Sequence, residues 1–367
     1  MSTPIRSLLL VCVVLCAGCV AQPRPAPEAG KATTPAAAST TAEAASAPIA
    51  AAPAPAGVVR TPASEQAFVA QLLRQHPDLD RAHIEQLLAE ARVQPSILAA
   101  MAHPAESMPW KDYRPIFLGQ ARIDAGIAFY RAHRALIDRI AAQYGVPPQV
   151  LVAILGVETY YGRQTGGYRV LDALYTLAFH YPPRAAFFQK ELGVFLSLPR
   201  SALPGPRAEL RGSYAGAMGW CQFMPTSFAH YGVSAAADGR VNLWSSLPDI
   251  LASTANYLAR HGWERGAPIA MPARASAQAE APRVERSEPI YSVAQLAARG
   301  YTPSAAVASD RAATLLTVRG VDGPEYWLTF GNFQVITRYN SSALYALAVT
   351  QLAAAIDASA HADGVTP

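Results

Sequence analysis

Glu158 lies near the end of an apolar stretch, VLVAILGVET, whose spacing predicts a helix. It follows Leu151 by seven residues and Ile154 by four, so it belongs to the apolar face of that helix. No Lys or Arg occurs in the two preceding turns to pair with it. Burial without a partner raises the pKa of a carboxyl, which then holds a proton near neutral pH. Such a carboxyl can act as a general acid.

Helical spacing alone favours a simpler interpretation, in which Glu158 faces outward or bonds Arg163. A second segment, residues 211–228, reverses this preference. Its glycines allow close backbone approach, and its side chains offer hydroxyl, aromatic and amide groups of the kind that bind sugars. These residues are Gly212, Ser213, Tyr214, Gly216, Gly219, Trp220 and Gln222. Taken alone, the segment would be a helix-packing loop with core aromatic residues.

The elements that must position these residues are mostly helices. Apolar periodicity, proline starts and glycine stops predict helices over 65–73, 81–91, 123–144, 183–198, 225–231, 247–261 and 340–356, and a further helix that opens at Pro147-Pro148 and contains Glu158. Short β-rich runs are predicted at 289–293, 314–318, 326–330 and 333–336. The fold class is therefore mainly α, with a small β-rich insertion before the last helix.

The N-terminus predicts export. Arg6 precedes a short apolar run, and small residues precede Cys19, so residues 1–18 are expected to be a lipoprotein signal peptide and Cys19 its lipidation site. Cys16 departs from the usual pattern, and ordinary secretion with cleavage near Ala17 is the alternative. After processing, only Cys19 and Cys221 remain, so no disulfide framework is expected.

Composition indicates which other segments are disordered and what kind of partner the protein has. Residues 19–60 combine the lipidated cysteine with an Ala/Pro/Thr-rich tether that is expected to be disordered, as is the tail 359–367. The net charge of +4 and pI near 8.9 suit an anionic polymer. No Lys/Arg-rich run is present, so no nucleic-acid partner is expected.

Several motifs in order along the chain resemble the lytic murein transglycosylase B family. They are GVETYYGRQTGGYRVLDALYTLAFHYPPRAAFF, GSYAGAMGWCQFMPTSF, NLW, ANYLARHGW and ITRYN. The resemblance implies a lysozyme-like α core over 113–265, an N-terminal helical part over 61–112, the β-rich insertion over 266–337 and a closing helix over 338–358. Val20, rather than Asp, after Cys19 favours the outer membrane, so the lipid anchor is expected to hold the protein at its periplasmic face. Peptidoglycan glycan strands and peptidoglycan synthases are the expected partners.

The resemblance implies that Glu158 is the catalytic residue. Members of the family use one carboxyl to protonate the glycosidic oxygen of the MurNAc-GlcNAc β-1,4 bond and then to deprotonate the C6 hydroxyl. The products end in 1,6-anhydro-MurNAc, and the second carboxylate of ordinary glycosidases is not needed.

The motif matches also imply a set of substrate-binding residues: Ser213, Gln222, Tyr257, Tyr339, Asn340, Tyr345 and Tyr113. For the tyrosines, packing in the core is an equally weighted alternative. Asp172 is expected to cap the helix that follows it rather than to act chemically.

No cofactor is expected. Several relatives carry an EF-hand-like calcium loop, which corresponds here to residues 233–240. Calcium prefers six to eight oxygen ligands, but Ala236 stands where a ligand is expected and Arg240 adds positive charge. The loop is expected to bind calcium weakly or not at all, and the histidines show no zinc-ligand spacing.

Three other functions are compatible with parts of the sequence. A hydrolytic muramidase would use Glu158 with a second acid that activates water. A peptidoglycan-binding scaffold would use the tether and the aromatic groove without catalysis. A cysteine hydrolase would use Cys221 with His180, His230 or His261 as its base, although free cysteine is usually a small core residue.

Overall fold

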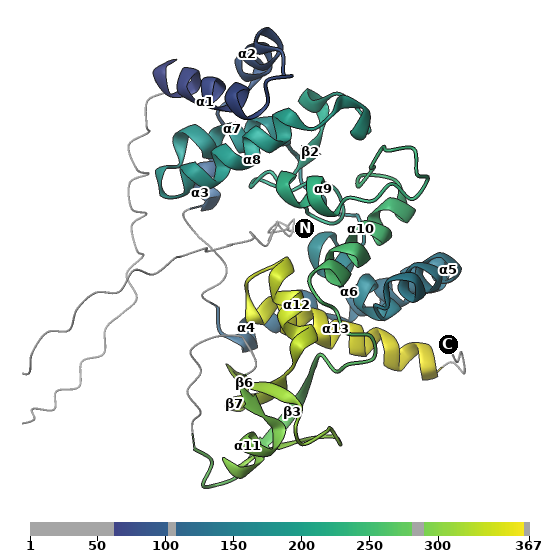
Figure 1. Ribbon diagram of the computed structural model, residues 1–367. Helices are drawn as coiled ribbons and strands as arrows, with labels where there is room; N and C mark the ends of the chain where they lie inside the picture. Colours follow the sequence, from purple (N-terminus) through teal and green to yellow (C-terminus); the bar gives the residue numbers. More distant parts are fainter. Residues whose placement is uncertain (1–61, 102–107, 281–289, 363–367) are drawn as a thin grey trace, which may run out of the picture.

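The structure is a computed structural model that describes residues 62–101, 108–280 and 290–362 (Figure 1). The predicted signal peptide, Cys19 and the tether lie outside these residues. Within the described part, no single helix is long and apolar enough to cross a membrane, although two helix pairs, bent by 109° and 112°, would pass that test by length and composition.

The N-terminal part is a helical layer formed by α1 (Pro62–Gln75), α2 (Arg81–Glu90) and α3 (Pro95–Met101). It lies against α7 (Val170–His180) and α8 (Ala185–Ser197), at the upper end of Figure 1. The buried side chains of α1 and α2 join the main hydrophobic core, so the layer is continuous with the rest of the α region.

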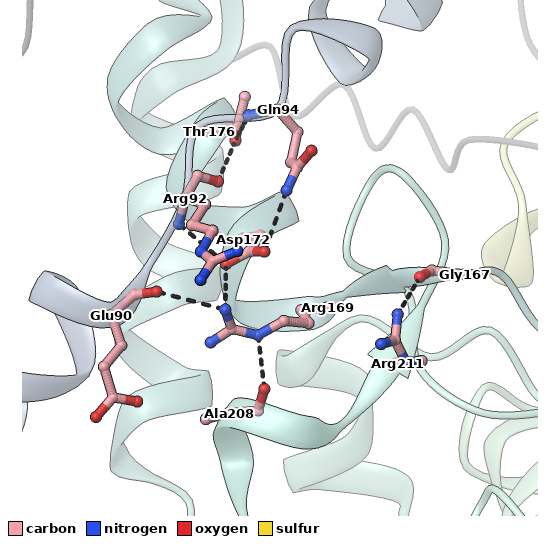
Figure 2. Close-up of polar contacts among 9 residues, drawn as sticks. All are labelled: Glu90, Arg92, Gln94, Gly167, Arg169, Asp172, Thr176, Ala208 and Arg211. Carbon is pink, nitrogen blue, oxygen red and sulfur yellow. Dashed lines mark hydrogen bonds and ion pairs between the residues drawn. The ribbon is translucent and has the colours of Figure 1, made fainter.

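A polar cluster fixes this layer to α7 (Figure 2). The buried carboxylate of Asp172 accepts hydrogen bonds from the Arg92 backbone N–H at 3.0 Å and from Gln94 Nε2 at 3.2 Å, and it forms an ion pair with Arg169 at 3.3 Å. The helix begins after Arg169 without a side-chain cap. The predicted capping role of Asp172 is therefore wrong, because its oxygens satisfy a distant segment, 80 positions away, instead of the first turn.

The core of the α region is α6 (Pro148–Thr159), which packs against α5 (Gln120–Tyr144), α10 (Leu247–Arg260) and α13 (Ala343–Ala362). Every residue from Val150 to Val157 is buried, as expected of a helix that is apolar on all sides. Pro148 occupies its first turn, where no backbone donor is needed. The shorter helices α4 (Trp110–Phe117), α9 (Pro225–Tyr231) and α12 (Gly331–Tyr339) complete this region.

The β-rich insertion forms a separate small unit at the lower end of Figure 1. Its five antiparallel strands are arranged in the order β4-β6-β7-β3-β5, with α11 (Val293–Ala298) between β4 and β5 in sequence. The strands are β3 (Ala270–Ala275), β4 (Tyr291–Ser292), β5 (Tyr301–Pro303), β6 (Ala312–Arg319) and β7 (Pro324–Thr329). A small core of its own, which includes Leu296, Leu315 and Phe330, holds the sheet and helix together. The mainly α class with a small sheet is confirmed.

Three sequence assignments need correction. The predicted β-run 333–336 is part of α12, because Phe333 and Ile336 lie one turn apart and bury themselves in the main core, and tertiary packing overrides their strand preference. Residue 289 of the predicted run 289–293 lies outside the described residues, and of 290–293 only Tyr291 and Ser292 are strand, since Ser292 and Gln295 form a capping box that starts α11. The last helix continues to Ala362, into the segment predicted as a tail.

Candidate active site

Glu158 lies one residue before the C-terminal end of α6, and its side chain is only partly exposed. The hydroxyl of Tyr345, from α13, donates a hydrogen bond of 2.6 Å to Glu158 Oε1. Burial raises the pKa of this carboxyl from 4.5 to about 8, although the Tyr345 bond opposes the rise. No ion pair joins Glu158 and Arg163 in the described part of the chain, so the predicted alternative pairing is wrong. The carboxyl is protonated near neutral pH and can give up its proton.

A tight reversal of the chain follows Glu158. Tyr160, Tyr161 and Gly162 have consecutive φ angles of 51°, 58° and 81°, which place all three in the left-handed region. Two tyrosines in this region cost of order 1–3 kcal/mol each and need support from their surroundings. The Tyr161 N–H donates to the Leu155 carbonyl at 3.0 Å, which ends the helix.

The first turn of α5 provides this support. The Tyr160 hydroxyl donates to the Ala121 carbonyl at 3.2 Å, and the Tyr161 hydroxyl donates to the Arg122 carbonyl at 2.9 Å. In return, Arg122 Nη1 donates to the Gly156 carbonyl at 2.6 Å, near the end of α6. Gly156 has no space for a larger residue, because an added Cβ would lie 2.7 Å from the Tyr161 hydroxyl oxygen. Glu158 is thus held at the end of a helix whose last turn is fixed from outside.

The glycine-rich segment 211–228 packs directly against this reversal. Thr159 Oγ1 lies 3.3 Å from the Trp220 carbonyl, and the Trp220 ring fills the position where a Cβ of Gly162 would lie, 2.1 Å away. Gly219 has a φ of 64°, and its Cβ would meet the Leu243 carbonyl oxygen at 2.3 Å. Both glycines are needed because backbone and ring approach where a side chain would stand.

The loop between α6 and the small ribbon of β1 (Tyr168–Arg169) and β2 (Arg211–Gly212) is tied to the same segment. Gln222 Nε2 donates to the carbonyls of Thr165, at 3.2 Å, and Gly219, at 2.7 Å. At the far end of the loop, Arg211 donates to the Gly167 carbonyl at 2.6 Å (Figure 2). The chain from Glu158 to Gly167 therefore has fixed ends and fixed contacts along its length.

A pocket opens beside the glycine-rich segment, and the predicted residues Gln222, Tyr257 and Tyr339 share it. Its complete lining is Phe187, Glu191, Gln222, Phe223, Met224, Thr226, Ser227, Tyr257, Arg338 and Tyr339. Glu158 is not one of the lining residues. It is linked to the pocket through Tyr345, which bonds Glu158 and whose ring stacks with that of the lining residue Tyr339 at a centroid distance of 6.5 Å. Aromatic faces beside amide, hydroxyl and charged groups form the kind of lining that binds sugar rings.

The tyrosines of the site also have structural partners. Tyr339 donates its hydroxyl to the Cys221 carbonyl at 2.7 Å, and Tyr257 donates to the Arg338 carbonyl at 2.6 Å. Their rings meet at 4.8 Å in a T-shaped contact. Their hydroxyls hold the glycine-rich segment and α12 in place while their rings line the pocket. The predicted packing role is confirmed for both, and the contact with substrate stays a prediction.

Three predicted contacts are more deeply buried and do not line this pocket. Ser213 is 1% exposed, and its Oγ accepts hydrogen bonds from the backbone N–H groups of Ala215, at 3.3 Å, and Ala217, at 3.0 Å. Asn340 accepts the Ser342 N–H at 3.2 Å, in the turn before α13. Tyr113 packs between Trp110 and Phe117 in α4.

Three residues that line the pocket were not among the predicted site residues: Glu191, Phe187 and Arg338. Glu191 is 2% exposed, and its carboxylate accepts hydrogen bonds from the Thr226 N–H at 2.9 Å and the Thr226 hydroxyl at 2.8 Å. Burial raises the pKa of Glu191 as well. Part of its signal was the same as for Glu158, since it follows Phe188 by three residues on the apolar face of α8, although Lys190 and Arg184 precede it.

Cys221 is not suited to nucleophilic catalysis. The thiol is fully buried, and its Sγ lies 3.4 Å from the Ile250 carbonyl oxygen and 3.3 Å from Thr254 Oγ1. Burial, with a smaller contribution from the negative charge of Glu158, raises the pKa of the thiol to about 12. A reactive cysteine needs a lowered pKa and access to substrate. Cys221 is a core residue.

Protein hydrogen bonds close the loop 233–240, which is expected from the resemblance to correspond to a calcium loop. The Asp249 carboxylate accepts the N–H groups of Ala235 and Asn242, both at 2.9 Å. Asp238 Oδ1 accepts from the Ser234 hydroxyl at 2.7 Å and from the Arg240 N–H at 2.9 Å. In the ranges that the structure describes, no three His, Cys, Asp or Glu residues gather where they could hold a metal ion.

A helical core with one proton-donating carboxyl beside an aromatic and polar pocket defines a glycan-cleaving enzyme of the lysozyme-like class. Residues 63–354 match the transglycosylase SLT domain, and the chain belongs to this family. It is a lytic transglycosylase that acts on peptidoglycan, and the family predicted from the motifs is confirmed.

Several relatives support this assignment. The chain is 38% identical to membrane-bound lytic murein transglycosylase B of Escherichia coli (strain K12) over 302 residues, which cover 79% of this chain and 82% of the relative. The structure of soluble lytic transglycosylase SltB1 from Pseudomonas aeruginosa matches with a TM-score of 0.74 and 43% identity, over 81% of this chain and 98% of that one. Slt35 from Escherichia coli, solved in complex with bulgecin A, matches with a TM-score of 0.73 and 38% identity, over 82% and 94% of the two chains.

Proposed function

We propose that Glu158 carries out both proton transfers of a non-hydrolytic cleavage of peptidoglycan at the MurNAc-GlcNAc β-1,4 bond. The protonated carboxyl donates its proton to the glycosidic oxygen as the bond to C1 of MurNAc breaks. The resulting carboxylate removes the proton from the C6 hydroxyl of the same sugar, and O6 bonds to C1 to close a 1,6-anhydro ring. The carboxyl ends protonated again, so one residue completes the cycle without water.

The observation that carries this proposal is the buried carboxyl with a pKa of about 8, next to a pocket of aromatic and polar groups. General acid–base catalysis of this kind is typically worth about 10²–10⁴-fold in rate. The other carboxyl of the pocket, Glu191, has both oxygens bonded to Thr226. A carboxylate held in this way is poorly placed to activate water, which favours the anhydro product over hydrolysis.

Substrate contacts are proposed from the motif matches and from the pocket. Gln222, Tyr257 and Tyr339 line the pocket and are proposed to contact the sugar rings. Tyr345 holds Glu158 and is proposed to direct its proton. Ser213, Asn340 and Tyr113 are buried and do not line the pocket, so their proposed contacts with substrate rest on the motif matches alone. Substrates that carry stem peptides are supported by SltB3 from Pseudomonas aeruginosa, solved with NAG-anhNAM-pentapeptide, which is 31% identical with a TM-score of 0.71.

Digestion of purified peptidoglycan by the mature protein tests this function. Mass analysis of the wild-type digest is expected to give anhydro-muropeptides, lighter by one water than hydrolysis products, and Glu158→Gln is expected to release none. Reducing ends in the wild-type products would instead indicate a hydrolytic muramidase. Identical products from both proteins would remove Glu158 from the mechanism, and no cleavage by either would leave a peptidoglycan-binding scaffold.

The cellular location is proposed from the sequence and from one relative. The Escherichia coli relative is named as membrane-bound. Cys19, after a short apolar segment, is proposed to carry a lipid anchor at the periplasmic face of the outer membrane. Peptidoglycan synthases are proposed as further partners within reach of the tether. Cys19→Ser is expected to move the protein from the membrane fraction to the soluble fraction, and an unchanged distribution would contradict the anchor.

No metal is proposed to take part. Slt35 has been solved in complex with calcium. Here Asp249 and Asp238 are occupied by backbone and hydroxyl donors, and the loop is proposed to keep its shape without the ion.

A further inference from the structure

The N-terminus of α9 is capped from another helix, α8, which lies beside it (Figure 1). Pro225 opens α9 without a backbone N–H, and Met224 at the cap position makes no side-chain bond. The next N–H, that of Thr226, is one of the donors that a helix start leaves unpaired. Glu191 Oε2 accepts it at 2.9 Å, and Glu191 Oε1 accepts the Thr226 hydroxyl at 2.8 Å. A residue of α8 thus takes the place of the missing cap.

Glu191 and Thr226 depend on each other for these bonds. Glu191 is 2% exposed, and a buried carboxylate is costly unless hydrogen bonds compensate for the lost water. Burial raises the pKa of Glu191, whereas the bonds from Thr226 and the positive charges of Lys190 and Arg184 lower it. Among the described residues, Thr226 alone donates hydrogen bonds to this carboxylate. The contact therefore fixes the start of α9 to α8.

A short closed turn connects Thr226 to Gln222. Met218 and Phe223 exchange two backbone hydrogen bonds, of 2.8 and 3.2 Å, which enclose residues 219–222. Inside this turn Gln222 has a φ of 50°, in the left-handed region that few residues other than glycine adopt. Such a conformation persists only where the surrounding structure holds it. The chain passes from Gln222 to Thr226 through Phe223, Met224 and Pro225, so the start of α9 fixes one end of the turn.

The turn also decides which end of the Gln222 amide is available to a ligand. Its Nε2 donates to the carbonyls of Gly219, at 2.7 Å, and Thr165, at 3.2 Å. A carbonyl only accepts, so these two bonds fix the nitrogen end of the amide. In the part of the chain that the structure describes, no donor bonds Gln222 Oε1. Gln222 lines the pocket, and this oxygen can accept a hydrogen bond from a sugar hydroxyl or amide N–H.

We propose that Glu191 is a positioning residue for Gln222, a role that rests on the proposed contact between Gln222 and the sugar. By capping α9 from α8, Glu191 keeps the left-handed turn in place and the amide oxygen at the pocket. Its effect falls on substrate binding, and the two proton transfers by Glu158 do not depend on it. Because Glu191 lines the same pocket, the test must separate this role from a direct action of its charge on the substrate.

Two substitutions separate the reach of Glu191 from its charge. Glu191→Gln keeps the length, an acceptor for the Thr226 N–H and an NH₂ that can donate to the Thr226 hydroxyl oxygen. Glu191→Asp keeps the charge but withdraws the acceptors by one methylene. KM and kcat are measured on purified uncross-linked glycan strands by the release of anhydro-muropeptides. Glu191→Asp is expected to raise KM about tenfold, the size of one lost hydrogen bond, with kcat nearly unchanged. Glu191→Gln is expected to restore the wild-type KM, and the pH profile of kcat should be the same in all three proteins.

A double-mutant cycle tests whether Glu191 acts through Gln222. Gln222→Ala is expected to raise KM about tenfold, and adding Glu191→Asp should raise it no further, since both changes remove the same contact. Additive losses would show that Glu191 acts independently and would overturn the proposal. A loss in Glu191→Gln as large as in Glu191→Asp would assign the effect to the charge and overturn it too, as would a fall in kcat at unchanged KM.

Asp172→Ala is the matched control, because Asp172 is also a buried carboxylate that accepts a backbone N–H from a distant segment, but away from the pocket. It is expected to lower the melting temperature and to leave KM unchanged. A KM rise equal to that of Glu191→Asp would show that lost stability alone is sufficient and would overturn the proposal. If the wild-type products carry reducing ends, the proposed chemistry of Glu158 fails separately. The same cycle of KM values, measured on those products, then still supports or overturns the role of Glu191.

Discussion

Tyr345 donates its hydroxyl hydrogen to Glu158 across the contact between α13 and α6, at 2.6 Å. The two residues are 187 positions apart, and the small β unit lies between them in sequence. A hydrogen bond to a carboxylate favours its charged form, so Tyr345 restrains the rise in pKa that burial imposes on Glu158. The closing helix therefore adjusts the acid of a helix that forms much earlier in the chain.

Removal of the Tyr345 hydroxyl should alter both the pKa and the position of the acid. Tyr345→Phe is expected to raise the pKa of Glu158 above about 8 and to lower kcat by roughly tenfold, the value of one oriented hydrogen bond. The pH dependence of kcat/KM should show an alkaline limb that moves to higher pH. If the alkaline limb does not move and activity is retained, the hydrogen bond from Tyr345 has no influence on the pKa of Glu158.

The raised pKa of Glu158 also predicts how stability depends on pH. Unfolded protein ionises this carboxyl above 4.5, but the folded protein resists ionisation until about 8, so the group destabilises the fold progressively as pH rises between these values. Glu158→Gln is expected to raise the free energy of unfolding by a few kcal/mol near pH 8, since each pKa unit is worth about 1.4 kcal/mol. At pH 4 the variant and wild type should be similar. Chemical denaturation at both pH values would measure this, and an equal difference at both would contradict the assignment.

Cys221 should be dispensable for catalysis. Cys221→Ala is expected to retain activity within a few-fold and to lose on the order of 1 kcal/mol of stability, because a small buried group is removed. The release of anhydro-muropeptides and thermal melting measure the two effects. Loss of all activity with an unchanged melting temperature would instead support a catalytic role for Cys221.

The end of α6 should not tolerate added volume. Gly156→Ala is expected to cost about 1–3 kcal/mol and to reduce kcat, because the new Cβ would press on Tyr161 and displace the turn after Glu158. Gly205→Ala is the matched control, since its Cβ would meet nothing within 4 Å. Denaturation curves and kcat of both variants would be compared. Equal effects of the two substitutions would contradict a specific close packing of Gly156 against Tyr161.

The loop around Asp249 should be insensitive to calcium. Millimolar calcium and a chelator are expected to give the same melting temperature. Asp249→Ala is expected to destabilise the protein by roughly 1–3 kcal/mol, because the N–H groups of Ala235 and Asn242 lose their acceptor. Differential scanning calorimetry measures both. A clear upward shift with calcium would show that the loop binds the ion.

Much of the site was visible in the sequence for a physical reason. The spacing of Glu158 from Leu151 and Ile154 fixed its face of the helix, and the glycines of 211–228 indicated close backbone approach, because both are local properties. The same helical spacing would have identified Glu191, which was overlooked. The strand assignment at 333–336 failed because Phe333 and Ile336 suit a strand as well as a helix, and only burial in the main core decided between them.

The amino-acid sequence by itself determined the helical class, the family and the candidate acid, since periodicity and motif spacing are local properties of the chain. Only the tertiary structure decided the partner of Glu158, the attachment of Asp172 to Arg92 and the stacking of Arg163 on Tyr160. The first two contacts join residues far apart in the chain, and the third depends on two left-handed tyrosines held by α5. Such arrangements follow from how whole elements pack, which no local pattern records.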